Sequence, residues 1–161
     1  MSPQPARTLP EDGAREGKYL TFALDAEEYG IGICKVKEII GMIPIRPVPQ
    51  TPPQVKGVIN LRGKVIPVVD LRLRFAMPPL EYSDRTCIVV VEVPGENGPN
   101  TMGVVVDAVS EVLPIKPQDI EDCPDFGIAA VDMQFITGIA KIGGSVKILM
   151  DIERVLGAEA L

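Results

Sequence analysis

Residues 55–69, VKGVINLRGKVIPVV, decide the fold that we expect for this chain. Two runs rich in β-branched residues, VKGVINL and VIPVV, flank a central RGK triplet at residues 62–64. A glycine at the centre of the triplet supplies the positive φ that a tight β-hairpin needs. Asp70 follows the second run and predicts the N-cap of a short helix over residues 71–75. The stretch therefore predicts a strand, a turn, a second strand and a short helix.

The same pattern occurs a second time in the chain. The sequence pattern of residues 57–71 recurs 81 positions later. Glycines stand at the same two places in both stretches, and each stretch ends with an aspartate followed by an apolar residue. Residues 30–39 recur 73 positions later. Residues 19–75 and 85–156 therefore read as two copies of one unit, each with two strands, a short connection, a hairpin and a short helix.

The composition favours strands throughout. The chain holds 19 valines and 17 isoleucines, and such β-branched side chains suit a pleated sheet. Prolines and glycines interrupt the apolar runs about every ten residues, a spacing typical of a barrel or a sandwich. A count of about five strands in each unit predicts a small closed barrel, because closure removes exposed sheet edges. One continuous sandwich is the alternative.

One segment has a helical pattern instead. Ile33, Val36, Ile39 and Ile40 are spaced as on one face of a helix, with charged residues between them. On periodicity alone, such residues are more often core than interface. They could contact a partner if an open groove formed where two barrels meet.

The composition also excludes several kinds of chemistry. The absence of histidine removes phosphohistidine, His-assisted nucleophiles and His metal ligands. A net charge of −6 and an aromatic content of 4% disfavour binding to nucleic acids. GVINLRGK at residues 57–64 is not a P-loop, because five residues rather than four separate its glycines. We find no compelling catalytic carboxylate pair, and we expect no catalytic residue, metal or cofactor.

Two features concern the location of the chain. Cys34, Cys87 and Cys123 are odd in number and widely spaced, which predicts neither a disulfide framework nor a zinc site and fits a reducing cytoplasm. Residues 1–17 are rich in proline, glycine and charge, and they predict a disordered tail. We see no signal peptide and no apolar run long enough to cross a membrane.

Arg62 is a candidate contact residue. Gly143 stands at the equivalent turn of the second unit, so the hairpin does not require an arginine. A guanidinium on a rigid hairpin tip suits recognition of a partner's carboxylate or carbonyl; an ordinary surface arginine is the alternative. Residues 43–77 carry a net charge of +5, which could steer an acidic partner. The proline-rich residues 44–53 read as a stiff loop or, alternatively, as a polyproline ligand.

Three stretches resemble the CheW-type chemotaxis coupling proteins. They are YLTFALDAEEYGIGICKVKEII, PVPQTPPQVKGVINLRGKVIPVVDLRLRF and GVVVDAVSEVLPI, of which GVINLRGKVIPVVDLR is the most specific. The resemblance covers about residues 18–157. It implies an all-β fold of two SH3-like five-stranded β-barrel subdomains that pack on a shared core, with short helices.

The resemblance also implies contact residues. A receptor-binding groove between the barrels would be lined by five apolar residues, Leu20, Ile33, Val36, Ile39 and Val109. Arg62 would add to receptor binding and Glu38 to assembly, whereas Gly57 and Gly63 would be structural. The kinase-facing residues are not assigned.

The function implied by the resemblance is that of an adaptor rather than an enzyme. Such a protein couples the cytoplasmic tips of chemoreceptors to the histidine kinase CheA, in the cytoplasm and peripheral to the receptor arrays. A coupling protein of a non-flagellar chemosensory pathway is the alternative. A small enzyme and a nucleic-acid-binding barrel are the competing classes, and the composition disfavours the second.

Overall fold

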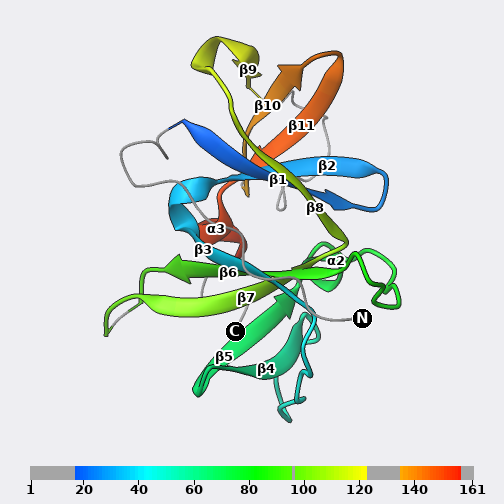
Figure 1. The fold of residues 1–161 in the computed structure, drawn as a ribbon, viewed down its shortest axis with the longest axis vertical. Coiled ribbons are helices and arrows are strands. Elements are labelled where there is room, and N and C mark those ends of the chain that lie inside the picture. Colours follow the sequence, from blue (N-terminus) through cyan, green and yellow to red (C-terminus); the bar gives the residue numbers. More distant parts are fainter. Residues whose placement is uncertain (1–16, 96, 123–134, 157–161) are drawn as a thin grey trace.

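The computed structural model describes residues 17–95, 97–122 and 135–156, which form two β-sheets with short helices (Figure 1). The expected disordered tail lies outside the described residues except for Gly17, whose carbonyl accepts the Ile115 N–H at 3.0 Å. Within the described residues, no helix combines the length and the apolar character that a membrane span requires.

The first sheet has the strand order β8-β1-β2-β11-β10-β9, and the second has the order β3-β6-β7-β5-β4. The first contains β1 (Lys18–Leu24), β2 (Glu27–Gly32), β8 (Ala108–Pro114), β9 (Ile120–Glu121), β10 (Ile136–Ile142) and β11 (Ser145–Met150). The second contains β3 (Val36–Gly41), β4 (Val55–Leu61), β5 (Lys64–Asp70), β6 (Cys87–Val93) and β7 (Asn100–Val106). The short helices are η1 (Ile33–Lys35), α2 (Leu71–Arg74), η2 (Pro117–Asp119) and α3 (Ile152–Val155). The expected all-β fold with short helices is confirmed.

The hairpin at the centre of the sequence argument is confirmed. β4 and β5 pair in antiparallel register, and Arg62 and Gly63 form the two-residue turn with φ values of +51° and +86°. Positive φ at both turn residues matches the right-handed twist of the flanking strands. The Asn60 Oδ1 atom accepts the Gly63 N–H at 2.8 Å and fixes the turn further.

The helix cap after β5 is confirmed as well. The Asp70 Oδ1 atom accepts the Arg72 N–H at 2.9 Å at the start of α2. In the second copy, the Asp151 Oδ1 atom accepts the Glu153 N–H at the same distance at the start of α3. The sequence repeat is thus a repeat of local structure.

The expectation that each copy would form its own barrel was wrong. β1 and β2 come from the first copy but pair with β8 and β11 of the second, while β6 and β7 of the second copy lie between β3 and β5 of the first. Four strand pairs join the copies: β2–β11 and β5–β7 are parallel, and β1–β8 and β3–β6 are antiparallel. The cause is the path of the chain, which changes sheet between β2 and β3 and again between β7 and β8.

The expected helix through Ile33 and Ile40 was also wrong. Only η1 is helical there, and β3 follows it as a strand that pairs with β6. A register shift between Val36 and Glu38 brings Val36, Ile39 and Ile40 to buried positions. The buried residues of this strand therefore have the spacing of one face of a helix. β-Branched residues pair well with the valine-rich β6. The segment therefore forms a strand despite its helix-like spacing of apolar residues.

Each sheet curls until its edges approach. In the second sheet, Arg46 follows β3 and bridges to Val58 of β4 through two backbone hydrogen bonds of 2.9 Å. In the first sheet, β9 follows β8 and pairs with β10 in the same way. Because β9 is long enough to count as a strand, the first sheet has six strands and the second has five.

The core shared by the two sheets is the largest apolar cluster. It takes Leu20 and Phe22 from β1, Val36 from β3 and Val104 from β7, all at most 1% exposed. An aromatic chain crosses it, with ring centroids 6.0 to 6.3 Å apart, through Phe22, Tyr29, Phe75 and Phe135. The sheets are therefore joined by packing as well as by the chain.

Candidate docking surface

The structure brings together Arg62 and Glu38, two of the residues expected to contact partners. Arg62 stands at the tip of the β4–β5 hairpin, and its Nη2 atom donates to Oε2 of Glu38 on β3. The hydrogen bond to Glu38 raises the pKa of the Arg62 guanidinium. β3 and β4 are the two edges of the second sheet, so this ion pair lies across the point where the sheet curls on itself.

The two partners of this ion pair differ in exposure. The Arg62 side chain is 67% exposed, whereas that of Glu38 is 19% exposed. Within the part of the chain that the structure describes, Oε1 of Glu38 is buried and has no hydrogen-bond partner. Glu38 thus holds the guanidinium in place, and the guanidinium faces solvent, where a partner's carboxylate or carbonyl can reach it.

The two glycines expected to be structural, Gly57 and Gly63, are favoured for different reasons. Gly57 has a φ of +144°, and a Cβ there would lie 2.0 Å from the Arg46 carbonyl oxygen. Gly57 therefore permits the close approach that closes the second sheet. Gly63 has open space around it, and its φ of +86° in the turn is what favours glycine.

Four of the five expected groove residues do not line an open groove. Leu20, Ile33, Val36 and Ile39 are between 0% and 5% exposed and belong to the core between the sheets. In this conformation the protein's own side chains fill the space that a partner helix was expected to enter. The alternation and helical spacing of these residues were signals of a core.

Val109 is the fifth, and it reaches the surface. It lies on β8, an edge strand of the first sheet, where it is half-buried against the shared core. Val112, which the sequence argument did not select, is half-buried on the same strand. Among the described strands, β8 is an edge of the first sheet and pairs with β1, so a partner could add to its other side.

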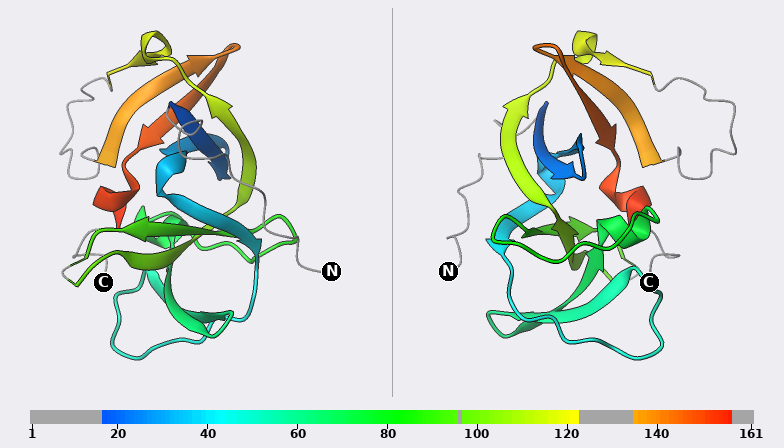
Figure 2. Two further views of the ribbon diagram at one scale, coloured as in Figure 1. Left: turned by 60° about the vertical axis from the view of Figure 1, so that its left-hand side comes forward. Right: turned by 90° about the vertical axis from the view of Figure 1, so that its right-hand side faces the viewer.

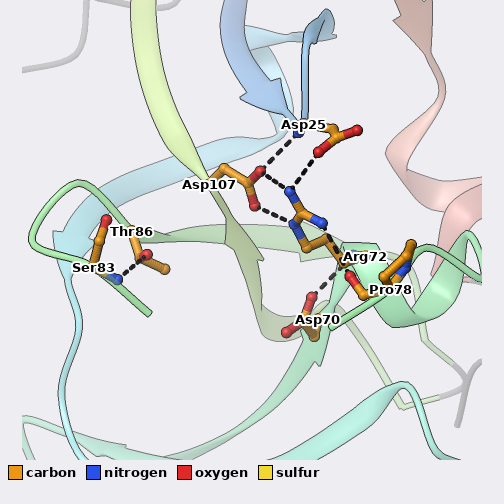
Figure 3. A network of polar contacts seen from close by, with 7 residues as sticks. All are labelled: Asp25, Asp70, Arg72, Pro78, Ser83, Thr86 and Asp107. Atoms are coloured by element: carbon orange, nitrogen blue, oxygen red, sulfur yellow. Dashed lines mark hydrogen bonds and ion pairs between the residues drawn. The ribbon is translucent and has the colours of Figure 1, made fainter. Parts of the chain in front are cut away.

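A polar cluster around Arg72 was not predicted from the sequence. Arg72 Nε and Nη2 donate to the two carboxylate oxygens of Asp107 at 2.8 and 2.7 Å, and Nη2 also donates to Asp25 at 3.1 Å (Figure 3). Arg72 Nη1 donates to the Pro78 carbonyl at 3.0 Å. The Arg72 side chain is 8% exposed. This cluster connects α2 of the second sheet to the β1–β2 turn of the first.

The cluster shifts the pKa values of its members. Burial alone would raise the pKa of the Asp107 carboxyl, but hydrogen bonds from Arg72 and from the Asp25 N–H hold it below its ordinary value of 3.8. The hydrogen bonds to Asp107 raise the pKa of Arg72. Burial, followed by the hydrogen bond that Tyr82 donates to Asp70, raises the pKa of the Tyr82 phenol.

The lowered pKa of Asp107 predicts loss of stability in acid. Because the folded state binds this proton less readily than the unfolded chain, the stabilisation is complete above about pH 5 and is lost as the pH falls through the folded pKa, below 3.8. Thermal unfolding between pH 6 and pH 3 measures the effect. Asp107→Asn, which cannot ionise, is expected to show a shallower dependence on pH; equal slopes in the two proteins would contradict this assignment.

Comparison with known proteins decides the family. The family model described as "CheW-like domain" matches residues 18–160. The chain belongs to the CheW-like domain family. It is 38% identical to the chemotaxis protein CheW of Klebsiella aerogenes, over 89% of this chain and 84% of the relative, and 34% identical to that of Rhizobium meliloti, over 92% and 91%.

A solved CheW structure has the same fold. The scaffolding protein TtCheW from Thermoanaerobacter tengcongensis superposes with a TM-score of 0.78 and is 35% identical in sequence, over 90% of this chain and 95% of that one. The two curled sheets with a common core are therefore the fold of a CheW-like domain. The family resemblance inferred from the GVINLRGKVIPVVDLR stretch is confirmed.

Proposed function

We propose that this CheW-family chain is a chemotaxis adaptor that couples the cytoplasmic tips of chemoreceptors to a CheA-type histidine kinase. The proposal is supported first by similarity along most of the chain to proteins named as chemotaxis CheW and to a CheW scaffold. It is supported second by the exposed guanidinium of Arg62, which Glu38 holds on the curled second sheet. The adaptor acts by binding and carries out no catalytic step.

The observation that carries the receptor contact is the exposed edge of β8. Val109 and Val112 pack against the shared core but are only half-buried, and a helical receptor tip could contact the apolar surface that they leave exposed. Arg62 supplies a charged contact at a separate position. For the buried Leu20, Val36 and Ile39 we propose that they support the strands of this surface and do not touch the receptor directly.

The adaptor acts on the cytoplasmic side, at the periphery of receptor arrays. Each contact would be modest in area, and repetition across an array would raise the overall avidity. A chemosensory pathway with a non-flagellar output would use the same surfaces. The partners, rather than the fold, distinguish these two cases.

A reconstitution with purified proteins tests the proposal. The full chain is immobilised and presented with a CheA-type kinase from the same cell and with a receptor cytoplasmic fragment, each alone and both together. We expect each partner to be retained alone and the chain to recruit the kinase to the receptor. Retention of neither partner would overturn the proposal.

Arg62→Ala tests the charged contact. The expected result is weaker retention of the receptor or kinase with at most a small fall in melting temperature, because Arg62 is largely exposed and its removal opens the Glu38 Oε2 atom to solvent, whereas the buried Arg72 leaves Asp107 no such access. Lys64→Ala, an exposed cation on the same hairpin, is the matched control and is expected to retain both partners. A variant that loses stability yet binds both partners normally would make Arg62 a structural residue.

A further inference from the structure

The two places where the chain changes sheet are held by side chains from equivalent helices. The first crossing runs through η1 into β3, and the second runs through Asp107 into β8; both connections can be followed in Figure 2. Arg72, the second residue of α2, binds Asp107 at the second crossing. Glu153, the second residue of α3, binds Lys35 at the first crossing, with 2.5 Å between Nζ and Oε1.

The repeat relates these two contacts to each other. Arg72 and Glu153 are separated by 81 positions and follow the equivalent capping residues Asp70 and Asp151. The helix α2 thus provides a cation that binds a carboxylate at the second crossing, and α3 provides a carboxylate that binds a cation at the first crossing. The two contacts, Arg72–Asp107 and Glu153–Lys35, are the same device with the charges reversed, and we call them the crossing clamps.

The crossing clamps differ in strength. The Arg72 clamp is buried, and its guanidinium makes two parallel bonds to Asp107 and further bonds to Asp25 and Pro78. Such a bidentate, charge-assisted contact is strong and little screened by salt. The Glu153 clamp is a single contact between side chains that are 44% and 31% exposed, for which a small contribution is the rule.

The weaker clamp also has space beside it. Lys35 and Glu153 border a hollow of about 360 Å³ whose other lining comes from residues at the end of β6 and in the β6–β7 connection. Near the Arg72 clamp, by contrast, the Asp107 N–H donates to the Ala23 carbonyl at 3.1 Å and so continues the pairing of β8 with β1 into the crossing. Within the described residues, the side chain of Glu153 thus holds the first crossing by one exposed ion pair, whereas Arg72 holds the second by several buried contacts.

We propose that Arg72 and Glu153 are positioning residues that set the angle between the two sheets, with the Arg72 clamp as the pivot and the Glu153 clamp as the contact that opens. The inference rests on the proposed adaptor function, because β3 begins directly after Lys35 and carries Glu38 of the ion pair with Arg62. A partner that binds one arrangement of the sheets better shifts the population towards it. The clamps thus determine how strongly binding of a partner at one sheet changes the arrangement of the other sheet.

Distances between spin labels on the two sheets test the proposal. Val65 on β5 and Ser145 on β11, both exposed, are replaced by labelled cysteines in a full chain whose three native cysteines are serines. Pulsed electron paramagnetic resonance then gives the distribution of the inter-sheet distance. Glu153→Gln is expected to broaden this distribution without lowering the melting temperature appreciably, and the charge-reversed pair Lys35→Glu with Glu153→Lys is expected to narrow it again.

The matched control is Lys141→Gln. Lys141 forms an ion pair with Glu121 at 2.9 Å between side chains that are 62% and 60% exposed, more than those of Lys35 and Glu153, and the pair joins β10 to β9 within the first sheet. Loss of the Lys141–Glu121 ion pair is expected to leave the distribution of the inter-sheet distance unchanged. This result would distinguish a crossing clamp from an ordinary surface ion pair. An unchanged distribution in Glu153→Gln, or broadening of equal size in Lys141→Gln, would overturn the opening contact.

Arg72→Lys tests the pivot. Lysine keeps the charge but cannot form the two parallel bonds to Asp107, so the mean inter-sheet distance is expected to shift. An unchanged mean would overturn the pivot. Failure of the adaptor function itself is recognised separately, because the unlabelled wild-type chain would then retain neither kinase nor receptor whatever the label distances show.

Discussion

A chain carrying Val36→Asp is expected to unfold. Val36 is 1% exposed, pairs with Val91 across β3 and β6, and lies in the core between the sheets. Burial of an unpaired carboxylate costs several kcal/mol, whereas a domain of this size has a total stability of about 5–15 kcal/mol. Thermal unfolding followed by circular dichroism at neutral pH should show loss of the wild-type transition or a large fall in its midpoint.

Val109→Asp is the matched control, because Val109 lies 73 positions later at the equivalent place of the repeat. It is half-buried on the edge strand β8, so the carboxylate can turn to solvent. We expect this variant to fold and to lose receptor binding. If Val36→Asp instead kept the wild-type melting temperature and lost only receptor binding, Val36 would be a contact residue and the assignment to the core would be wrong.

Arg72→Ala is expected to lower the free energy of unfolding by about 3–5 kcal/mol, the range found when one partner of a buried ion pair is removed. The variant leaves Asp107, whose side chain is 20% exposed, without its bidentate partner and also removes the contacts with Asp25 and the Pro78 carbonyl. Urea denaturation at neutral pH measures the loss.

Arg154→Ala is the control for that experiment. Arg154 lies on α3 and forms an ion pair with Asp151, but its side chain is 62% exposed and the nitrogen–oxygen distance is 3.6 Å. A change within about 0.5 kcal/mol is expected for such a surface position. A loss below about 1 kcal/mol in Arg72→Ala would match an exposed ion pair and contradict a buried clamp.

Local structure was the part of the fold that the sequence predicted well. The glycine-centred turn, the flanking β-branched runs and the Asp70 cap all act within a few residues, so their signals are complete in the sequence. The repeat of Asp70 at Asp151 extended the same reading to the second half. Arg62 was identified because the equivalent turn of the second unit has a glycine in its place.

What depends on contacts between distant segments was not predicted. The period of β3 looked helical because a register shift against β6 changes which side chains are buried. The partner of Arg72, Asp107, is 35 residues away, and no local pattern marks it. Likewise, the repeat aligns Lys147 with the core residue Ile66, yet Lys147 is buried beside Glu28 of β2 at 2.7 Å because the parallel join of β2 and β11 supplies a carboxylate there.

The interleaving of the two copies has a consequence for any fragment of the chain. A polypeptide holding only the first copy would leave β2 without β11 and β5 without β7, with backbone donors and acceptors unpaired along both strands. Such open edges invite pairing with the missing strands of another molecule. The single chain therefore has the architecture of a strand-exchanged homodimer whose two subunits have been fused end to end.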